Sequence, residues 1–310
     1  MSFSEQRAAK SPTGADLNLY VKRADGNPRA VIQINHGLAE HAARYARFAD
    51  FLGERGFHVY AHDHRGHGAT KAPDAPLGKF ADIDGIAKVM ADVGAVHDLI
   101  AAEHAGLPVI VFGHSLGASI ALNFVLRHSG RVHAAAIWNG NFSQGLLGQL
   151  ALAILGWERM RLGSDVPSRL LPKLTFQAWG KAVPNHRTLF DWLSRDPAEV
   201  DKYIADPLCG WDASVSMWRD VVSMALHAGK DSSFAGIRRD LFVNLVGGEK
   251  DPASDHGKAV HHLAKRMQAM GFSNLVSKVY AETRHESLNE VNRDAVMRDF
   301  AAWTEEVLKS

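Results

Sequence analysis

Ser115 stands between two glycines where an apolar run gives way to helical spacing, in VIVFGHSLGASIALNF, residues 109–124. A strand that turns at one residue into a helix strains the backbone there, and glycines two positions away remove the collisions. The turn lifts the serine hydroxyl above the sheet edge at a helix N-terminus, where the helix dipole favours negative charge. Although 27 glycines make a chance Gly-x-Ser-x-Gly conceivable, the strand and helix on either side favour a nucleophilic serine.

A serine nucleophile needs a base within hydrogen-bond reach and a carboxylate that orients the base. Catalytic groups of parallel sheets lie on loops after the strands, so we expect them after LFVNLVGG and LVSKVYAE. The first run is followed by Glu249 and Asp251, and the second by His285. We predict the triad Ser115, Asp251 and His285. Asp251 is preferred because it precedes Pro252 at an expected turn, and Glu249 is the rival acid.

Two backbone N–H groups should stabilise the oxyanion of the reaction. The first is that of Leu116, directly after the predicted nucleophile, and the second is that of Leu38 in the loop after AVIQIN. Gly37 would allow the loop to approach closely, and a simple turn is the less favoured explanation of this glycine. Leu38 and Leu116 are therefore the predicted oxyanion-hole residues.

The elements that must position these groups alternate between short β-branched runs and helical stretches, which is typical of a parallel sheet covered by helices on both faces. Residues 17–35 are expected to form a hairpin that turns near Asp25-Gly26. Helical segments punctuated by prolines replace this alternation further along the chain. We expect residues 1–139 and 235–310 to form one α/β core, and residues 140–234 to be a helical cap inserted into it.

The composition excludes several classes of function. Lys and Arg number 35 against 34 Asp and Glu, so no charge footprint for nucleic acid is expected. Cys209 is the single cysteine, which rules out an internal disulfide, leaves too few thiols for a CxxC site and favours a reducing, cytoplasmic compartment. The N-terminus lacks the apolar core of a signal peptide, and the longest apolar stretch is too short and too interrupted to span a membrane.

The segment HDHRGHG, residues 62–68, raises the question of a metal site, since His62, Asp63, His64 and His67 are ligand types. These groups can equally hydrogen-bond the loop backbone and pair with Arg65, and no HExxH motif accompanies them. We therefore expect neither a metal nor a cofactor.

Five segments between residue 36 and residue 290 are informative together: HGLAEHAARY, DHRGHG, GHSLG, GEKDP and RHESLNE. This set resembles the α/β-hydrolases, and within them the monoacylglycerol lipase and lysophospholipase-like group, which is also classified with the serine aminopeptidases. The resemblance implies an α/β-hydrolase fold, an acyl-serine intermediate in ester hydrolysis, and a cap over an acyl pocket. It also implies that Glu40 and His41 lie near the polar end of the site, with loop bracing as the alternative for Glu40. The residues expected to contact substrate are His36, Gly37, Glu40, His41 and His114.

Other functions stay open at this stage. A peptidase that releases N-terminal residues would need a carboxylate in the cap, and Glu199, Asp201 and Asp212 are the candidates. Epoxide or haloalkane hydrolysis would place an aspartate where Ser115 stands, and a binding protein without catalysis would have no use for the triad. The apolar run LLGQLALAIL, residues 146–155, could touch a bilayer surface. The cap tryptophans could line an acyl tunnel, although a place in the cap core is favoured for most; they are Trp157, Trp179, Trp192, Trp211 and Trp218.

Overall fold

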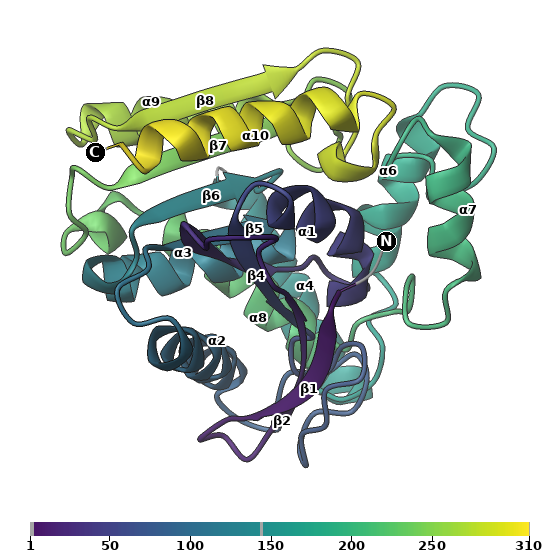
Figure 1. The fold of residues 1–310 in the computed structure, drawn as a ribbon. Coiled ribbons are helices and arrows are strands. Elements are labelled where there is room, and N and C mark those ends of the chain that lie inside the picture. Colours follow the sequence, from purple (N-terminus) through teal and green to yellow (C-terminus); the bar gives the residue numbers. More distant parts are fainter. Residues whose placement is uncertain (1–2, 143–144, 310) are drawn as a thin grey trace.

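A computed structural model describes residues 3–142 and 145–309, and its centre is a sheet of eight strands in the order β1-β2-β4-β3-β5-β6-β7-β8. The strands from β3 to β8 run parallel to one another, whereas β2 is antiparallel to both β1 and β4 (Figure 1). The predicted, mostly parallel sheet is thus confirmed. The strands are β1 (Glu5–Lys10), β2 (Asp16–Lys22), β3 (Ala30–Asn35), β4 (Phe57–His62), β5 (Val109–His114), β6 (Ala134–Trp138), β7 (Phe242–Gly248) and β8 (Leu275–Tyr280).

The hairpin predicted near Asp25-Gly26 is wrong, because β2 pairs with β1 and β4 and not with β3. The hairpin lies one element earlier, where the chain turns at Gly14 with a φ of 82°. Both strands that flank Asp25-Gly26 are read correctly as strands, but β3 is buried along its whole length and takes parallel neighbours on both sides. β1 is a largely exposed edge strand, so its sequence has little hydrophobic pattern to reveal it.

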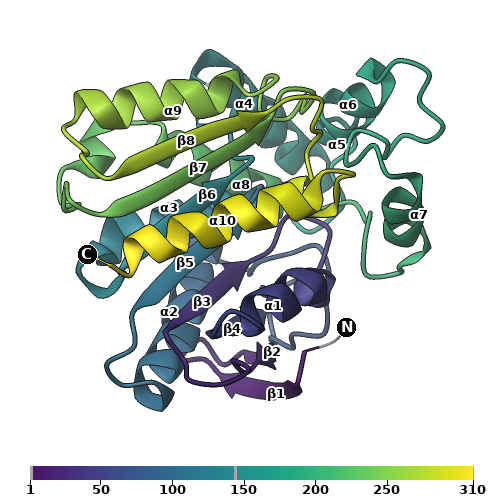
Figure 2. The ribbon, with the colours of Figure 1, turned by 45° about the horizontal axis from the view of Figure 1, so that its top comes forward.

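Helices cover both faces of the sheet (Figures 1 and 2). On one face, α1 and α10 pack against an aromatic cluster that includes Phe48, Phe112, Trp138 and Phe300. On the other face, α3 packs against β5 and β6, α9 packs against β7 and β8, and α2 packs beside α3. The helices of the two layers are α1 (Ala46–Gly53), α2 (Gly85–Glu103), α3 (Leu116–His128), α9 (Lys258–Ala269) and α10 (Arg293–Val307), with short 3-10 helices η1 (Ala42–Tyr45), η2 (Ser129–Arg131) and η4 (Ser287–Asn289).

The segment between β6 and β7 is helical, and its helices α5, α6 and α7 lie beyond the strand ends toward which the arrowheads of β7 and β8 point (Figure 2). Two of the helices begin at side-chain caps, since Asp196 accepts a hydrogen bond from the N–H of Ala198 and Ser214 accepts one from Met217. The last of them, α8, packs on α3 and therefore belongs to the core as much as to the cap. The exact cap bounds of 140 and 234 stay a prediction. These elements are α4 (Gly145–Leu162), α5 (Leu171–Leu174), α6 (Phe176–Ala182), α7 (Pro197–Ala205), α8 (Val215–Ala228) and η3 (Asp231–Phe234).

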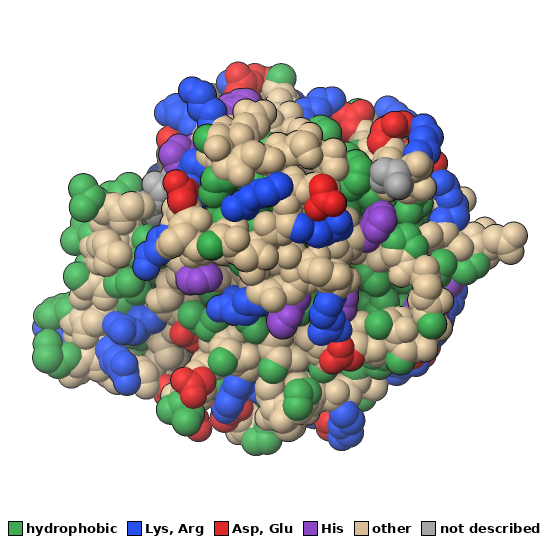
Figure 3. All heavy atoms as spheres, turned by 90° about the vertical axis from the view of Figure 1, so that its left-hand side faces the viewer, with side chains coloured by type: hydrophobic (Ala, Val, Ile, Leu, Met, Phe, Trp, Pro, Cys, Tyr) green, Lys and Arg blue, Asp and Glu red, His purple; other side chains and the backbone are tan. Residues whose placement is uncertain are grey.

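The surface carries charges of both signs. On the face that Figure 3 shows, basic and acidic side chains are interspersed and form no extended patch of one sign. This distribution matches the formal net charge of +1. Among the described helices, none combines the length and the apolar character needed to cross a bilayer.

Candidate active site

Ser115 occupies the turn between β5 and α3 with a strained backbone, at φ 56° and ψ −117°. Its N–H donates to the carbonyl oxygen of Trp138 on the neighbouring strand, 3.0 Å away. The glycines explain how so sharp a turn is packed: a Cβ at Gly113 would collide with the carbonyl oxygen of Gly117, and a Cβ at Gly117 with that of Asn35. The sequence pattern thus corresponds to a strand and a helix in contact too close for any larger residue.

His285 follows β8 and meets Asp251, which follows β7. The Nδ1 atom of His285 lies 3.0 Å from each carboxylate oxygen of Asp251. Because a carboxylate only accepts, Nδ1 carries the proton, and Nε2 is left with a lone pair that can take a proton. Both Ser115 and His285 line one cavity. The structure therefore brings the three predicted triad members to the same place.

Asp251 stays ionised although it is fully buried. Burial alone would raise its pKa, but the attraction of His285 and hydrogen bonds outweigh burial and hold the pKa below its ordinary value. The hydroxyl of Ser254 donates at 2.7 Å and the amide of Asn139 at 3.1 Å. The rival acid Glu249 is exposed, and its carboxylate accepts from the N–H of Glu282 at 3.1 Å.

Asn139 is a site residue that sequence reasoning missed. Its side chain joins Asp251 to the hydroxyl of Ser287, which donates to the Asn139 carbonyl oxygen at 3.1 Å. Its backbone adopts a left-handed conformation with a φ of 53°. Asn139 carries no charge and so gives no signal for a triad acid, although its place directly after β6 puts it at the same sheet edge as the predicted triad.

Leu38 and Leu116 both line the cavity that holds Ser115. Within the described ranges, neither N–H donates a hydrogen bond to another group of the protein. Leu116 is the first residue of α3, so the helix dipole reinforces its N–H. Two unengaged donors beside the serine are what a developing oxyanion requires.

Glu40 braces the loop that carries Leu38. Its Oε1 atom accepts from the N–H of Gly37 at 2.5 Å and from the hydroxyl of Tyr45 at 2.9 Å. Arg44 pairs with its other oxygen and also holds Glu286 through two hydrogen bonds of 2.7 Å. Burial of Glu40 would raise its pKa, but Arg44 and His114 hold that pKa well below its ordinary value. Bracing is thus the role that the contacts of Glu40 support.

The histidines predicted to touch substrate are buried behind this loop. His36 donates from Nδ1 to the carbonyl oxygen of Gly37 at 2.8 Å, and its Nε2 accepts from the N–H of His64 at 3.0 Å. His114 donates from Nε2 to the carbonyl oxygen of His285 at 2.9 Å, and His41 pairs with Asp206. Within the described part of the chain, the cavity lining includes none of the residues predicted to contact substrate, which are His36, Gly37, Glu40, His41 and His114.

The segment with His62, Asp63, His64 and His67 is engaged in the fold. Asp63 accepts from the backbone N–H groups of Ala42 at 2.8 Å and Ala69 at 2.9 Å. Burial lowers the pKa of each of the three histidines well below its usual range, so their rings are neutral. Arg65 was expected to pair with a group of this segment. It pairs instead with Asp92 on α2, whose carboxylate lies 2.9 Å from the guanidinium.

The cavity at Ser115 measures about 570 Å³ and is bordered by α4, α5, α6 and α8. Trp179 and Trp218 line it, whereas Trp192 packs against the His285 ring with centroids 4.9 Å apart and the ring planes tilted by 44°. The expectation that most cap tryptophans are internal to the cap therefore holds only in part. The apolar wall includes Leu38, Leu147, Leu150, Ile154, Leu171, Leu174, Phe176, Trp179, Trp218, Val221 and Val222.

The cap is attached directly to the loop of His285. The N–H of His285 donates to the carbonyl oxygen of Trp192 at 3.3 Å, and that of Glu286 donates to Leu193 at 2.7 Å. The guanidinium of Arg284 reaches two further cap carbonyl oxygens, at 2.6 and 2.9 Å. These contacts join segments that are far apart in the sequence, so no local sequence pattern predicts them.

A model of the family described as serine aminopeptidase, S33, matches residues 26–292. The chain belongs to this family. Among its relatives, the monoacylglycerol lipase of Mycolicibacterium smegmatis is 28% identical over 286 residues, which cover 90% of this chain and 89% of that protein. The human monoglyceride lipase is 30% identical over 187 residues, which cover 59% of this chain and 53% of that protein, so this match spans about half of its length.

Solved structures show the same fold as this S33 family member. A thermostable carboxyl esterase from Bacillus coagulans superposes with a TM-score of 0.85 at 22% identity, covering 99% of both chains. A monoglyceride lipase variant from Saccharomyces cerevisiae gives 0.76 at 15% identity, covering 99% of this chain and 98% of that one. Family membership and the lipase relatives identify the protein as a serine hydrolase. The solved structures show that it has the α/β-hydrolase fold with cap helices, as the resemblance of the sequence motifs implied.

Proposed function

We propose that the protein hydrolyses carboxylic esters of a single acyl chain, such as monoacylglycerols or lysophospholipids, through an acyl-serine intermediate. The observation that carries the proposal is the mainly apolar cavity of about 570 Å³ that opens onto Ser115. This volume lies within the range of small-molecule sites, roughly 300–1,000 Å³. Relatives named monoacylglycerol lipase, among them the one from Mycolicibacterium smegmatis, support the same substrate class.

In the proposed mechanism, the hydroxyl of Ser115 attacks the ester carbonyl while Nε2 of His285 accepts its proton. The negative oxygen that forms is held by the N–H groups of Leu38 and Leu116, each worth on the order of 3 kcal/mol of barrier. Asp251 stabilises the resulting imidazolium. The imidazolium then protonates the leaving alcohol, and water releases the acyl chain by the same sequence of steps.

An aminopeptidase activity would need a free carboxylate to bind the substrate ammonium. Of the carboxylates weighed for this role, Glu199 pairs with Arg47 at 2.6 Å and Asp201 pairs with Arg187 at 2.7 Å. The carboxylate that borders the cavity is Asp255, which has Lys258 at 3.3 Å. The apolar wall and this pairing favour an uncharged acyl chain over an ammonium group.

The outer surface of α4 supports a further proposal, that the cap touches a lipid surface while substrate enters. Leu146 is 89% exposed and Met160 is 80% exposed, near the two ends of this helix. Leu147 and Leu150 on the same helix line the cavity and are also exposed. Exposed apolar side chains of this kind mark contact surfaces, and here they adjoin the acyl pocket.

The test of the proposed function is a hydrolysis panel. It compares monoacylglycerols of increasing chain length, a lysophospholipid, short aryl esters and amino-acid anilides, while a separate sample of the enzyme is labelled with a fluorophosphonate. We expect labelling at Ser115 and the highest kcat/KM on a single-chain acyl ester. A preference for the short aryl ester would leave the mechanism intact and overturn the substrate class, whereas a preference for the anilides would favour the peptidase.

The matched variant is Ser115→Ala, which removes the attacking oxygen and keeps the packing of the turn. We expect loss of labelling and of nearly all hydrolysis, with an unchanged melting temperature. Hydrolysis at the wild-type level in this variant would refute the nucleophile.

A further inference from the structure

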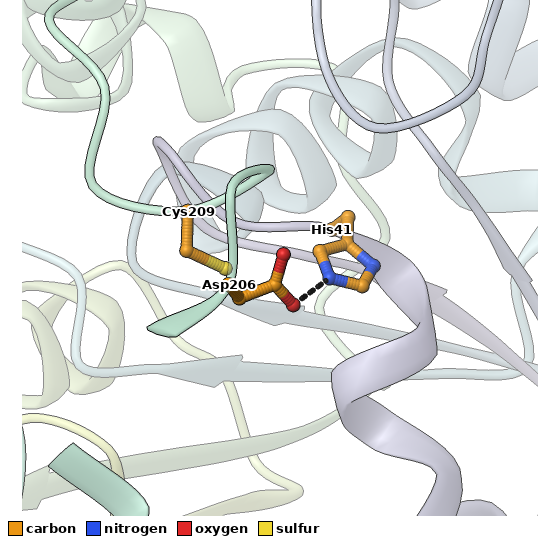
Figure 4. Close-up of side chains that lie close together, drawn as sticks. All are labelled: His41, Asp206 and Cys209. Carbon is orange, nitrogen blue, oxygen red and sulfur yellow. Dashed lines mark hydrogen bonds and ion pairs between the residues drawn. The ribbon is translucent and has the colours of Figure 1, made fainter. Parts of the chain in front are cut away.

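Three metal-ligating side chains gather where the cap meets the loop after β3 (Figure 4). They are the imidazole of His41, the carboxylate of Asp206 and the thiol of Cys209, and their ligand atoms all lie within 4.8 Å of one another. His41 and Cys209 are buried, and Asp206 is partly exposed. None of the three belongs to the proposed triad or lines the acyl cavity.

Local structure fixes the two cap donors side by side. Asp206 follows α7 and begins a turn in which the N–H of Cys209 donates to the Asp206 carbonyl oxygen at 3.0 Å. Pro207 occupies the second position of this turn, where its restricted φ is favourable. The first and fourth residues of such a turn lie close together, so the carboxylate and the thiol face the same side.

His41 comes from the other segment and completes the group. Its Nε2 atom lies 2.8 Å from the carboxylate of Asp206, across a sequence separation of 165 residues. The two segments are also fastened by their backbones, since the N–H of Gly210 and the hydroxyl of Tyr203 each donate to the Ala39 carbonyl oxygen at 2.9 Å. The donors are therefore held together by the fold.

We propose that His41, Asp206 and Cys209 form a binding site for Zn²⁺ that ties the cap to the loop after β3. Zn²⁺ takes imidazole, carboxylate and thiolate ligands at about 2.0–2.3 Å in a tetrahedral arrangement, so donors already within 4.8 Å need only small movements. The thiolate selects Zn²⁺ over Mg²⁺ or Ca²⁺, which prefer oxygen ligands. Water fills the fourth position, on the side where Asp206 is exposed.

Binding of Zn²⁺ displaces a proton from each of two ligands, Cys209 and the Nε2 atom of His41. On metal binding, the thiol of Cys209 releases its proton to solvent, and the sulfur lone pair forms the metal bond. The proton that Nε2 of His41 donates to Asp206 moves to Nδ1, which leaves the lone pair of Nε2 to bind the metal. The hydrogen bond between His41 and Asp206 is thereby replaced by two bonds to one cation.

The experiment uses the full chain, stripped of metal with a chelator and titrated with Zn²⁺ by calorimetry and with Co²⁺ by absorbance. We expect one Zn²⁺ per chain, a higher melting temperature with Zn²⁺, and a thiolate-to-Co²⁺ charge-transfer band in the near ultraviolet. Because Cys209 is the single cysteine of the sequence, such a band can arise from no other residue. Absence of saturable binding, or binding without the band, would overturn the proposal.

Two variants distinguish this site from adventitious binding. Cys209→Ser should abolish the charge-transfer band and weaken Zn²⁺ binding by about 100-fold, since loss of even an outer partner of a metal ligand costs 10–100-fold. Asp206→Asn, at a more exposed position, should weaken binding yet keep the band, and it decides the matter if Cys209→Ser does not fold. His262→Ala, on the exposed side of α9, is the control and should bind like the wild type. Equal affinity in all variants would contradict the site.

Discussion

The ring of His114 reaches across the sheet edge to His285 and donates a hydrogen bond from Nε2 to its carbonyl oxygen, 2.9 Å away. His114 is the residue directly before the proposed nucleophile, so the nucleophile turn itself holds the backbone of the proposed base. Burial disfavours a charged His114, but the nearby carboxylate of Glu40 outweighs burial and raises the pKa of His114. The same carboxylate braces the loop that carries Leu38. His114 and Glu40 therefore connect the nucleophile turn, the loop of His285 and the loop of Leu38.

This link predicts a kinetic role for His114. His114→Ala removes the donor to the His285 carbonyl, and we expect kcat to fall by about 10- to 100-fold, because a displacement near 1 Å costs about that much. KM should change little, since the side chain does not line the cavity. His114→Gln, which retains a donor, should recover part of the rate. Equal losses in the two variants would show that the hydrogen bond is not responsible.

Asp251→Asn tests the proposed acid. The amide would favour the wrong imidazole tautomer of His285, and we expect kcat to fall by about 10⁴-fold with little change in the melting temperature. Glu249→Gln is the matched control, because its carboxylate is exposed and bonded to Glu282, and it should retain wild-type kinetics. Loss of activity in the control and not in Asp251→Asn would exchange the two roles.

Two glycine substitutions test the close packing beneath Ser115. Gly117→Ala would drive a methyl group into the carbonyl oxygen of Asn35, so we expect a large fall in the melting temperature. Gly94→Ala, within α2, meets only Phe124 at 4.0 Å and should stabilise the protein by up to about 1 kcal/mol. Thermal unfolding of both variants measures the contrast. A harmless Gly117→Ala would mean that α3 can move away from β3.

Buried neutral histidines predict destabilisation in mild acid. Burial lowers the pKa of His36 to about 4 and those of His62 and His67 to about 3. Below about pH 6.5 the unfolded chain binds protons that the folded state refuses, so each histidine costs about 1.4 kcal/mol per pH unit until its folded pKa is reached. His114 has the opposite sign, since its pKa is raised, and offsets part of the loss.

The measurement is the free energy of unfolding in urea at several pH values between about 7 and 5, a range above the titration of most carboxylates. We expect the free energy of unfolding to decrease steadily as the pH is lowered, and the decrease to be less steep in His67→Gln. His262→Ala, an exposed position, should leave the slope unchanged. A flat profile would contradict the prediction, because it would show that the folded and unfolded states bind the same number of protons over this range.

The exposed apolar residues of α4 predict a dependence on how the substrate is presented. A Leu146→Ser, Met160→Ser double variant should lower the rate on monoacylglycerol embedded in vesicles several-fold, because these side chains are strongly exposed at the cap. Neither residue lines the cavity, so hydrolysis of a soluble short ester should be unchanged. Equal loss on both substrates would indicate damage to the cap and not lost contact with lipid.

The sheet and the order of the proposed triad could be predicted because their signals are local. Continuous apolar runs mark the buried strands, and the glycines around Ser115 report a close approach that the structure contains. The hairpin was misplaced because β1 is a polar edge strand, and Asp25-Gly26 imitates a hairpin turn inside a crossover. A turn signal states that the chain bends but not which strands it joins.

The supporting contacts of the site could not be read from the chain. Asn139 carries no charge and was passed over, although it donates to Asp251. Arg44 braces Glu40 from the short 3-10 helix η1, four residues further along the chain, where no α-helical periodicity indicates the pair. The contacts of Arg284 with cap carbonyls arise only when the two segments fold together.

The backbone bonds from His285 and Glu286 to the carbonyl oxygens of Trp192 and Leu193 limit what can be exchanged in this molecule. A chimera that received its whole insertion from another hydrolase would lose the acceptors that keep the imidazole in place, and its turnover would suffer whatever pocket it gained. Engineering of acyl preference should therefore replace α4 to α6 alone and keep the native residues 190–196, which hold the backbone of His285 in place.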